Sequence, residues 1–440
     1  MKSIIIAFLF PLFVFGQTPL SLSEAVSIAL ANNYQVKIAQ KNIEISENNN
    51  SWALTGKNPN INASVQSNNG YTNINNPASF LTQLSSISTG IVPSVEMNWI
   101  LYNGNGFSLN KNRLEELENL NAENAKNIFE NTILSTINAY FNLQVLSKQL
   151  AILSEALKLS AERLDWLQER ESFGQSGKFE RLQGLDAYFA DSAAYLNQLN
   201  IYQNSLRTFN SLLGESDLSK DYLLTEELSP SERNWNEIEL TEKMWQNNSV
   251  LKVQQINKSL AIIQTEIEKT TKLPQISLRG GLNYNYNLSN GNGTLLSGES
   301  LSLNAISSRT INGTIGLSAT YSIYDGGIRK KNIQTAKIQE EIADYNILDL
   351  KRTLHLNLSN LIGEVNFQKE RLSLAQNTVS NAQQNLEIAE ERIKKGQITS
   401  FDFRTVQLSY FNANQQILSI LFTIKMLETE IIRLTEGLVN

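Results

Sequence analysis

Residues 311–327 have the sequence INGTIGLSATYSIYDGG, which contains two different structural signals. Up to Ile323, every second position is apolar or glycine and the positions between are polar or glycine. This period predicts a β-strand with one apolar and one polar face. The pattern ends at Tyr324-Asp325-Gly326-Gly327, where two consecutive glycines permit a sharp change of backbone direction. The stretch therefore predicts a strand that turns abruptly into the next element.

Beyond Gly327 the spacing of apolar residues changes from two to about 3.6, which is the period of an α-helix. The pattern predicts one helix over 328–395 and a second over 401–436, separated by a turn near Gly396. No proline interrupts either segment. At 1.5 Å per residue the first helix would be about 100 Å long.

A weaker copy of the whole arrangement lies 222 positions earlier in the chain. Tyr102-Asn103-Gly104 corresponds to Tyr324-Asp325-Gly326, and Gly174-Gln175 corresponds to Gly396-Gln397. Self-similarity at a fixed offset indicates two tandem structural repeats. The expected segments are repeat 1 (17–214), a linker or equatorial region (215–236) and repeat 2 (237–437).

Each repeat is expected to contain a short helix, two strands and two long helices, in that order. Ser21 and Glu24 have the spacing of a capping box, which favours the start of the first short helix. Polar segments at 68–90 and 289–309 are expected to be loops between the paired strands. The expected short helices are 22–48 and 240–271, the strands lie near 61–71, 92–102, 276–288 and 311–324, and the long helices are 107–172, 179–213, 328–395 and 401–436.

The first residues are typical of an export signal. Met1-Lys2 is a short basic start, and Ile4–Phe15 is an apolar run too short to cross a bilayer as a helix. We expect a signal peptide over residues 1–16, with cleavage before Gln17. The chain contains no cysteine, which suits an exported protein that needs no disulfides.

Several function classes find no support in the composition. The net charge of −6 and the lack of a basic block with interleaved aromatic residues argue against a nucleic-acid partner. His355, the single histidine, lies inside a helical pattern without a nucleophile motif nearby. Neither a glycine-rich phosphate loop nor a cluster of metal ligands is present. We therefore expect no enzyme activity and no cofactor.

The alternating strands fit two kinds of sheet. Strands of about ten residues with one apolar face are typical of membrane β-barrels, but a half-buried sheet of a soluble protein has the same alternation. The export signal and the long polar loops favour the outer membrane.

Four strands are too few to close a barrel, because small barrels need about eight. An open sheet in lipid would leave unpaired backbone amides at its edges, at several kcal/mol each. Copies of the chain must therefore combine their strands in a closed ring. Two copies would give eight strands and a filled interior, whereas three would give twelve and leave room for a lumen.

Short motifs in a doubled order give the chain a family resemblance. They are Tyr324-Asp325-Gly326-Gly327, its copy Tyr102-Asn103-Gly104, the segment from Glu391-Arg392 through Gly396 to Phe401-Asp402 and Gln407, and the opening Leu22-Ser23-Glu24-Ala25. In this order the chain resembles the TolC family of outer-membrane efflux proteins over residues 18–437. The resemblance implies a mainly α-helical fold with membrane β-strands.

The same resemblance implies an assembly and its partners. A TolC-like homotrimer has a 12-stranded β-barrel, with four strands from each chain, continued by a long α-helical barrel. It lies in the outer membrane with a periplasmic extension. Its implied partners are a periplasmic adaptor (membrane fusion) protein and an inner-membrane transporter of the RND or ABC class. The protein would then be a passive exit path, for efflux or type I secretion, and the transporter would supply the energy.

The resemblance also assigns roles to individual residues. Asp402 maps onto an acidic residue of the periplasmic constriction, and Glu180 is its copy in repeat 1. Thr405 occupies a position that is acidic in some members, and Ile398 replaces an arginine that locks the gate. The turns that would contact the adaptor contain Gly174, Gln175, Gly396 and Gln397. The strand-to-helix switches contain Tyr102, Gly104, Tyr324, Asp325, Gly326 and Gly327.

Two alternatives remain open at this point. Asp402 has a purely structural explanation, because an acid in the first turn of a helix is favoured by the helix dipole. The chain could also be a periplasmic coiled-coil adaptor or scaffold without a pore. Such a protein would contain one helical hairpin flanked by compact β domains, whereas this sequence predicts two hairpins, each preceded by long strands.

Overall fold

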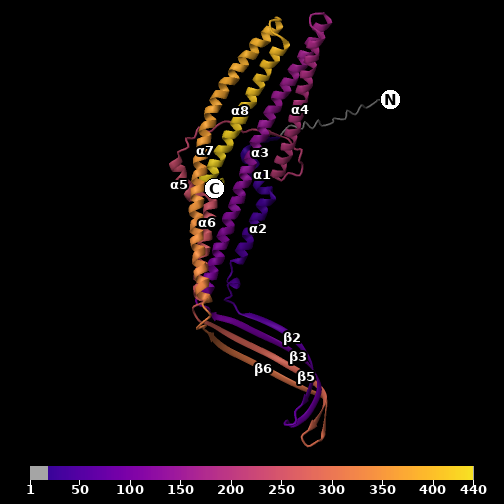
Figure 1. Ribbon diagram of the computed structural model, residues 1–440, viewed down its shortest axis with the longest axis vertical. Coiled ribbons are helices and arrows are strands. Elements are labelled where there is room, and N and C mark those ends of the chain that lie inside the picture. Colours follow the sequence, from indigo (N-terminus) through magenta and orange to yellow (C-terminus); the bar gives the residue numbers. More distant parts are fainter. Residues whose placement is uncertain (1–17, 440) are drawn as a thin grey trace, which may run out of the picture. The chain divides into compact units, whose positions relative to one another are not determined.

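The computed structural model describes residues 18–439 (Figure 1). The expected signal peptide over 1–16 lies outside the described residues. The chain divides into two compact units, each built from segments that are far apart in sequence. Unit 1 comprises the residues up to Ile43, 122–253 and 347 onward, and unit 2 comprises 44–121 and 254–346.

Two pairs of long helices repeat with equal lengths. Helices α3 and α7 each contain 67 residues, and α4 and α8 each contain 36. The equal lengths agree with the internal duplication seen in the sequence. The helices are α1 (Leu22–Asn32), α2 (Tyr34–Asn49), the 3-10 turn η1 (Trp52–Thr55), α3 (Gly106–Ser172), α4 (Lys178–Leu213), α5 (Glu237–Asn247), α6 (Ser249–Thr270), α7 (Ile328–Lys394) and α8 (Ser400–Thr435).

The prediction of one continuous short helix in each repeat is wrong, because an asparagine divides each expected helix into two helices. Asn33 has an extended backbone between α1 and α2, and Asn248 does the same between α5 and α6. The amide of Asn33 donates to the carbonyl of Leu212 at 3.3 Å, and that of Asn248 donates to the carbonyl of Leu434 at 3.2 Å. Both asparagines thus satisfy carbonyls at the end of a long helix, where no intrahelical donor remains. The capping box of Ser21 and Glu24 is present.

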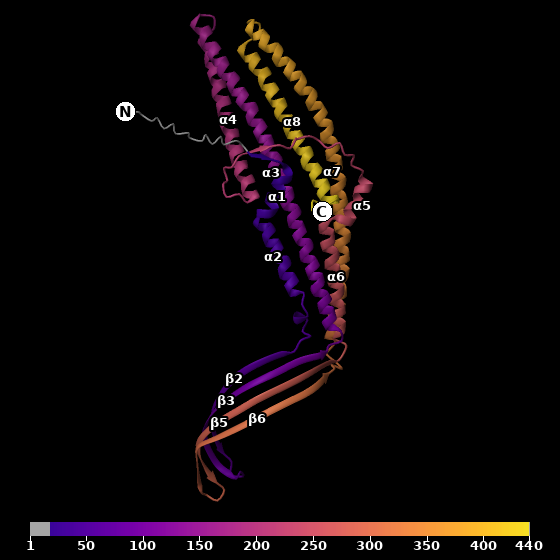
Figure 2. The same ribbon diagram turned by 180° about the vertical axis from the view of Figure 1, so that it is seen from behind.

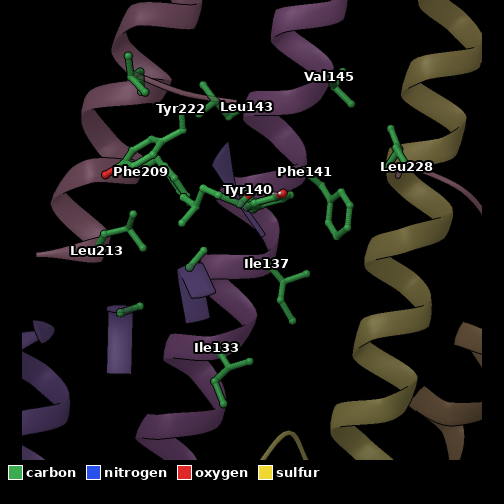
Figure 3. Packing of buried hydrophobic residues seen from close by; sticks show 14 of the residues in the cluster. Ile133, Ile137, Tyr140, Phe141, Leu143, Val145, Phe209, Leu213, Tyr222 and Leu228 are labelled. Atoms are coloured by element: carbon green, nitrogen blue, oxygen red, sulfur yellow. Dashed lines mark hydrogen bonds between the residues drawn. The ribbon is translucent and has the colours of Figure 1, made fainter. Parts of the chain in front are cut away.

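The largest cluster of buried apolar residues lies in unit 1, around aromatic side chains of repeat 1 (Figure 3). Tyr140 packs edge-to-face against Phe141 and Phe209, with ring centroids 5.5 and 6.2 Å away. The Tyr140 hydroxyl donates to the Leu20 carbonyl at 2.8 Å and accepts from the Glu226 N–H at 3.1 Å. Tyr140 is therefore buried with its hydroxyl group fully hydrogen-bonded.

The region between the repeats contains ordered structure. Strand β4 (Tyr222–Leu224) pairs in parallel with β1 (Thr18–Leu20), next to Tyr140. Further on, the carboxylate of Glu428 in α8 accepts the Ser231 N–H, and Lys369 in α7 donates to the Ser231 carbonyl at 3.1 Å. Burial raises the pKa of Glu428, although these partners oppose the shift.

Unit 2 contains one antiparallel sheet of four strands in the order β2-β3-β5-β6 (Figures 1 and 2). Hairpin β2–β3 comes from repeat 1 and hairpin β5–β6 from repeat 2, and β3 pairs with β5. Strands β2 and β6 are consequently the two edges. The strands are β2 (Asn60–Asn75), β3 (Leu81–Tyr102), β5 (Gln275–Leu295) and β6 (Ser300–Thr320).

The long polar loops expected at 68–90 and 289–309 are wrong. Strand pairing continues through both segments and leaves only residues 76–80 and 296–299 as connections. Asparagine and glycine in these segments are poor strand signals by composition, but the ladder pairs their backbones with neighbouring strands. At the other end, β6 stops at Thr320 rather than near 324.

Over residues 61–65, 95–101, 276–288 and 311–317, strand register places most apolar residues on one face of the sheet. Ala63 lies opposite Val95, Val95 opposite Leu282, and Leu282 opposite Gly313. The neighbouring row on the other face is polar and consists of Ser64, Ser94, Asn283 and Asn312. Since side chains alternate between faces, this register gives the sheet one apolar and one polar face.

Candidate functional site at the ends of the helix pairs

The two turns that close the helix pairs have the same backbone construction. Gly174 and Gly396 both have a left-handed backbone, with φ of 69° and 68°. The N–H of Gln175 donates to the Arg170 carbonyl at 2.8 Å, and the N–H of Gln397 donates to the Arg392 carbonyl at 2.9 Å. Glycine is favoured here because a Cβ is strained in this conformation. The predicted turn residues therefore terminate α3 and α7, and contact with a partner stays a prediction.

Asp402 lies in the first turn of α8 and is exposed. Its carboxylate accepts from the Thr399 hydroxyl at 2.7 Å and from the Thr399 N–H at 3.2 Å, while its own N–H donates to that hydroxyl. This capping box gives Asp402 a definite structural role. An exposed acid held in a fixed position can also act on a passing ion, so the structural role and the predicted constriction role are compatible.

The two repeats differ at this point. In repeat 1 the residue before α4 is Gly177, which has no side chain to cap the helix, and Glu180 is exposed. Thr405 is exposed as well, and its hydroxyl donates to the Phe401 carbonyl at 3.1 Å. An acidic residue is thus fixed by a cap at the end of the second helix pair but not of the first.

A buried charged cluster connects the two helix pairs in unit 1, and the sequence reasoning missed it. Asp191 in α4 is 8% exposed and forms an ion pair with Arg404 in α8. Its second carboxylate oxygen accepts from the Ser160 hydroxyl in α3. Arg404 also donates to the side-chain carbonyl of Gln407 at 3.0 Å. One carboxylate therefore connects three helices from both repeats.

A second arginine strengthens the same junction. Arg163 in α3 donates through Nε to the hydroxyl of Ser400 at 2.8 Å and through Nη2 to its carbonyl at 2.6 Å. Ser400 is the first residue of α8, so this guanidinium is fastened to the start of that helix. Because a guanidinium is planar, it can bind both oxygens at once, which an ammonium group cannot do with comparable geometry.

Burial lowers the pKa of Arg163 to about 10; the positive charge of Arg404 acts in the same direction, and Asp191 opposes it. The group therefore stays protonated at neutral pH. Two guanidinium groups share one buried carboxylate in this cluster. Loss of that carboxylate would leave two like charges together, away from bulk water.

Comparison of the repeats distinguishes the two members of the ion pair but does not pair them. The position equivalent to Arg404 in repeat 1 is Leu182, and the position equivalent to Asp191 in repeat 2 is Ala413. Each charged residue thus replaces an apolar or small residue of the other repeat, near a predicted turn. Sequence alone gives no reason to pair them, since they are 213 positions apart.

The switches from strand to helix in unit 2 are built around a side-chain cap in each repeat. Asp325 accepts from the N–H groups of Gly327 and Arg329 at 3.0 and 2.9 Å, and the hydrogen bond from Arg329 N–H is the main cause of its lowered pKa. Gly326 and Gly327 have φ of 71° and 87°. Tyr324 precedes them in an irregular segment and is 83% exposed.

The first switch achieves the same change of direction differently. Tyr102 is the last residue of β3, and Asn103 accepts the N–H of Phe107 at 3.2 Å. Gly104 has φ of 67°, and a Cβ at this position would lie 2.9 Å from Leu273. Glycine is therefore required both by conformation and by space.

The described residues contain no other obvious chemical centre. Within residues 18–439 no group of three or more histidine, cysteine or acidic side chains is arranged to hold a metal ion. Over the same residues, none of the helices has the length and apolar character needed to cross a membrane.

Comparisons with known proteins find one family model that matches part of the chain. Residues 240–424 match the model of the outer membrane efflux protein family. No curated protein sequence matches the chain.

Solved structures show that the resemblance in fold extends over almost the whole chain. The CmeC outer membrane channel of Campylobacter jejuni has a TM-score of 0.75 at 18% identity, with 94% of this chain and 85% of that chain covered. For the outer membrane protein VceC of Vibrio cholerae the values are 0.70, 13%, 94% and 96%. For the MtrE outer membrane channel of Neisseria gonorrhoeae, solved in an open state, they are 0.70, 15%, 94% and 89%. The predicted TolC-like fold of the chain, mainly α-helical with a four-stranded β-sheet, is thereby confirmed, as is the family resemblance; closure of a 12-stranded barrel by three copies stays a prediction.

Proposed function

We propose that this chain is an outer membrane efflux protein that forms a trimeric passive conduit. The match of residues 240–424 to that family and the channel fold of the solved structures support the proposal. An inner-membrane transporter of the RND or ABC class would drive substrates through it, by way of a periplasmic adaptor. The family consists of channels rather than enzymes, which agrees with the absence of a catalytic motif in the sequence. The pore would lie in the outer membrane, and the helices would extend into the periplasm.

The sheet of unit 2 carries this proposal. Its apolar face runs from Ile276 to Leu288 along β5, which is about 41 Å along the strand at 3.4 Å per residue. With a strand tilt of about 40°, this corresponds to roughly 30 Å across the membrane, close to the apolar band of about 25 Å in outer-membrane barrels. The edge strands β2 and β6 run in opposite directions, so β6 of one copy can pair antiparallel with β2 of the next. Three copies would give twelve strands without a free edge.

The long helices offer a second surface for neighbouring copies. Leu356, Phe367 and Leu374 on α7 are 59%, 52% and 69% exposed, at intervals of 11 and 7 residues. Phe189 and Leu196 on α4 are 58% and 62% exposed, seven residues apart. These intervals place the side chains of each helix along one stripe. Such stripes are expected to be covered in an assembly of helices.

The assembly can be tested on purified protein in detergent. We expect a trimer by light scattering coupled to size-exclusion chromatography, and a β-barrel that runs at a different position on a gel before and after heating. Reconstitution in planar lipid bilayers should give discrete channel events. A stable monomer with intact β-structure would contradict the proposal.

We propose further that the resting channel is closed at the ends of the helix pairs, and that the cluster of Asp191, Arg163 and Arg404 is the lock. The arginine expected at position 398 in the family is isoleucine here, so a lock at that position is missing. The cluster instead fastens the start of α8 to α3 and α4, as its ion pair and hydrogen bonds require. Opening would break these contacts as one packed helix pair shears against the other.

Replacing Asp402 with asparagine is expected to reduce the preference of the open channel for cations. The exposed carboxylate of Asp402 would be repeated three times around the axis, and a ring of acidic side chains attracts cations. Asparagine keeps an oxygen that can cap the helix, so the fold should be preserved. The reversal potential under a salt gradient measures the effect. Glu180→Gln measures the contribution of the predicted copy in repeat 1, and Glu162→Gln, an exposed acid of α3 with no predicted pore role, is the control. An unchanged reversal potential for Asp402→Asn would remove this residue from the pore.

A further inference from the structure

The far end of the sheet, near the loops at 76–80 and 296–299, does not follow the division into faces described above. Ile74 lies opposite Leu84, Leu84 opposite Gly293, and Gly293 opposite Leu301. These residues form one row across all four strands. Counting along β2 and β3, the row lies on the face that carries Ser64 and Ser94 nearer the helices, and not on the face of Val95. An apolar row therefore sits on the polar face.

An irregular register on β6 extends this apolar group by one more residue. Pairing shifts between Ser289 and Gly291, where β6 contains an additional residue and Ala305 adopts φ of 52°. The N–H of Ala305 donates to the side chain of Asn290 at 2.6 Å. Leu303 lies opposite Gly291, two residues from Leu301, so the two leucines share a face. Because a one-residue bulge exchanges the two faces of a strand, both lie on the polar face rather than on the face of Gly313.

The sheet is also curved toward this face. On β3, Leu84, Ser86 and Ser88 are half-buried, whereas Gln83, Ser85, Ile87 and Thr89 between them are exposed. Side chains on the concave side of a curved sheet are the more covered ones, so the half-buried face is the concave one. A hollow at this level is lined by Ile74, Leu84 and Leu301 together with neighbouring polar residues of the same strands. Figures 1 and 2 show that the strands bend near their hairpin connections.

Glycine makes this bend possible at one position. A Cβ on Gly291 would lie 2.2 Å from the Ser85 carbonyl oxygen and 2.6 Å from the Ser86 Cα. Strands β5 and β3 therefore approach more closely here than any side chain would allow. The close approach lies next to the bulge, so both features occur at the same level of the sheet.

The position along the strands places this row outside the lipid. Gly293 is five residues beyond Leu288, the last apolar residue of the band on the other face, or about 17 Å along the strand. In the proposed barrel the polar face lines the lumen. The bend would then bring the rows of three copies toward the pore axis, at the end remote from the helices.

We infer that Ile74, Leu84, Leu301 and Leu303 from three copies form a hydrophobic constriction at the extracellular mouth, a second gate in addition to the lock at the helix ends. No charged side chain belongs to the row, and a narrow apolar ring resists the entry of water and ions. The row of each copy is covered by the equivalent rows of the other two. This inference rests on the proposed function, because it requires the closed trimeric barrel.

The test uses planar bilayers and a channel whose helix-end lock is released by Asp191→Ala and Arg404→Ala. In that background Ile74→Ser, Leu84→Ser and Leu301→Ser together are expected to raise the single-channel conductance about two-fold or more, because a hydroxyl-lined ring stays wet. Ile87→Ser is the matched control, since Ile87 lies on the same strand but on the opposite face and is 61% exposed. Equal conductance of the triple variant and its background would overturn the inference.

A gentler variant guards against misfolding of the triple substitution. The chain contains no cysteine, so Leu84→Cys introduces a single thiol. Modification with a positively charged methanethiosulfonate reagent should increase the conductance of the open channel, and a reducing agent should reverse the change. The same treatment of Ile87→Cys should have no effect. If the conductance of Leu84→Cys does not change after complete labelling, that result would also contradict the proposed constriction.

The outcome separates this inference from the proposed function. If the unmodified protein shows no trimer or no channel events, the proposed function itself fails. If it shows normal events that substitutions at Leu84 leave unchanged, only the constriction fails.

Discussion

A channel carrying Asp191→Ala is expected to conduct several-fold more current at rest than the unmodified channel. Asp191 is the carboxylate that joins α4 to Arg404 of α8 and to Ser160 of α3. Its removal leaves Arg404 and Arg163 together, with side chains that are mostly buried. Breaking a buried ion pair from one side typically costs about 3–5 kcal/mol, because an uncompensated charge remains. A cost of that size, repeated in each copy, favours separation of the helix pairs.

The measurement is the open probability of single channels in planar bilayers, together with the midpoint of thermal unfolding. Glu162→Ala is the matched control: its ion pair with Lys158 lies on the same stretch of α3, but both side chains are more than half exposed. Loss of such a surface pair costs at most about 1 kcal/mol. Asp191→Ala and Arg404→Ala together should cost less than the sum of the two single changes, since the pair is coupled. Additive costs and an unchanged open probability would show that the cluster does not hold the channel closed.

The variant Ile315→Lys is expected to prevent assembly into a stable trimer. Ile315 lies on the apolar face of β6, opposite Gly280, and is 81% exposed in the single chain. In the proposed barrel it faces lipid near the middle of the apolar band. A lysine at this depth costs about 2–4 kcal/mol per chain, and the trimer would contain three.

Two neighbouring substitutions make this result specific for membrane depth and face. Thr314 lies on the polar face. Thr314→Lys should therefore leave the heat-modifiable barrel intact, because charges are tolerated in a lumen. Leu317→Lys lies two residues nearer the end of the band and should destabilise less than Ile315→Lys. The fraction of folded barrel at increasing denaturant concentration ranks the stability of the three variants. Equal tolerance of lysine at 314 and 315 would mean that the assigned faces are incorrect.

Local sequence patterns predicted most of the helices and strands, because each type of element has its own period of apolar residues. Alternation from Ile311 to Leu317 and the helical spacing beyond Gly327 each arise from contacts within a few residues of the chain. The duplication supplied the same elements in repeat 1, where the signal was weaker. Asn33 and Asn248 divide the short helices, but this effect depends on the carbonyls of Leu212 and Leu434, which lie far away in sequence.

The strands were predicted too short for a related reason. Residues between Asn68 and Gly90 are mostly small and polar, and such residues have low strand propensity by themselves. Their strand conformation comes from backbone pairing across the sheet, which the sequence does not encode locally. The apolar row of Leu84 was hidden for the same reason, since its face is assigned only after the register is known.

By itself, the sequence determined the type and order of most elements and their duplication. These follow from side-chain period and glycine positions, which are local properties. Only the tertiary structure decided which distant residues meet. The pairing of Asp191 with Arg404 and the face occupied by Leu84 depend on how helices pack and strands align. Packing and register depend on side chains from both partners, and one segment alone does not contain that information.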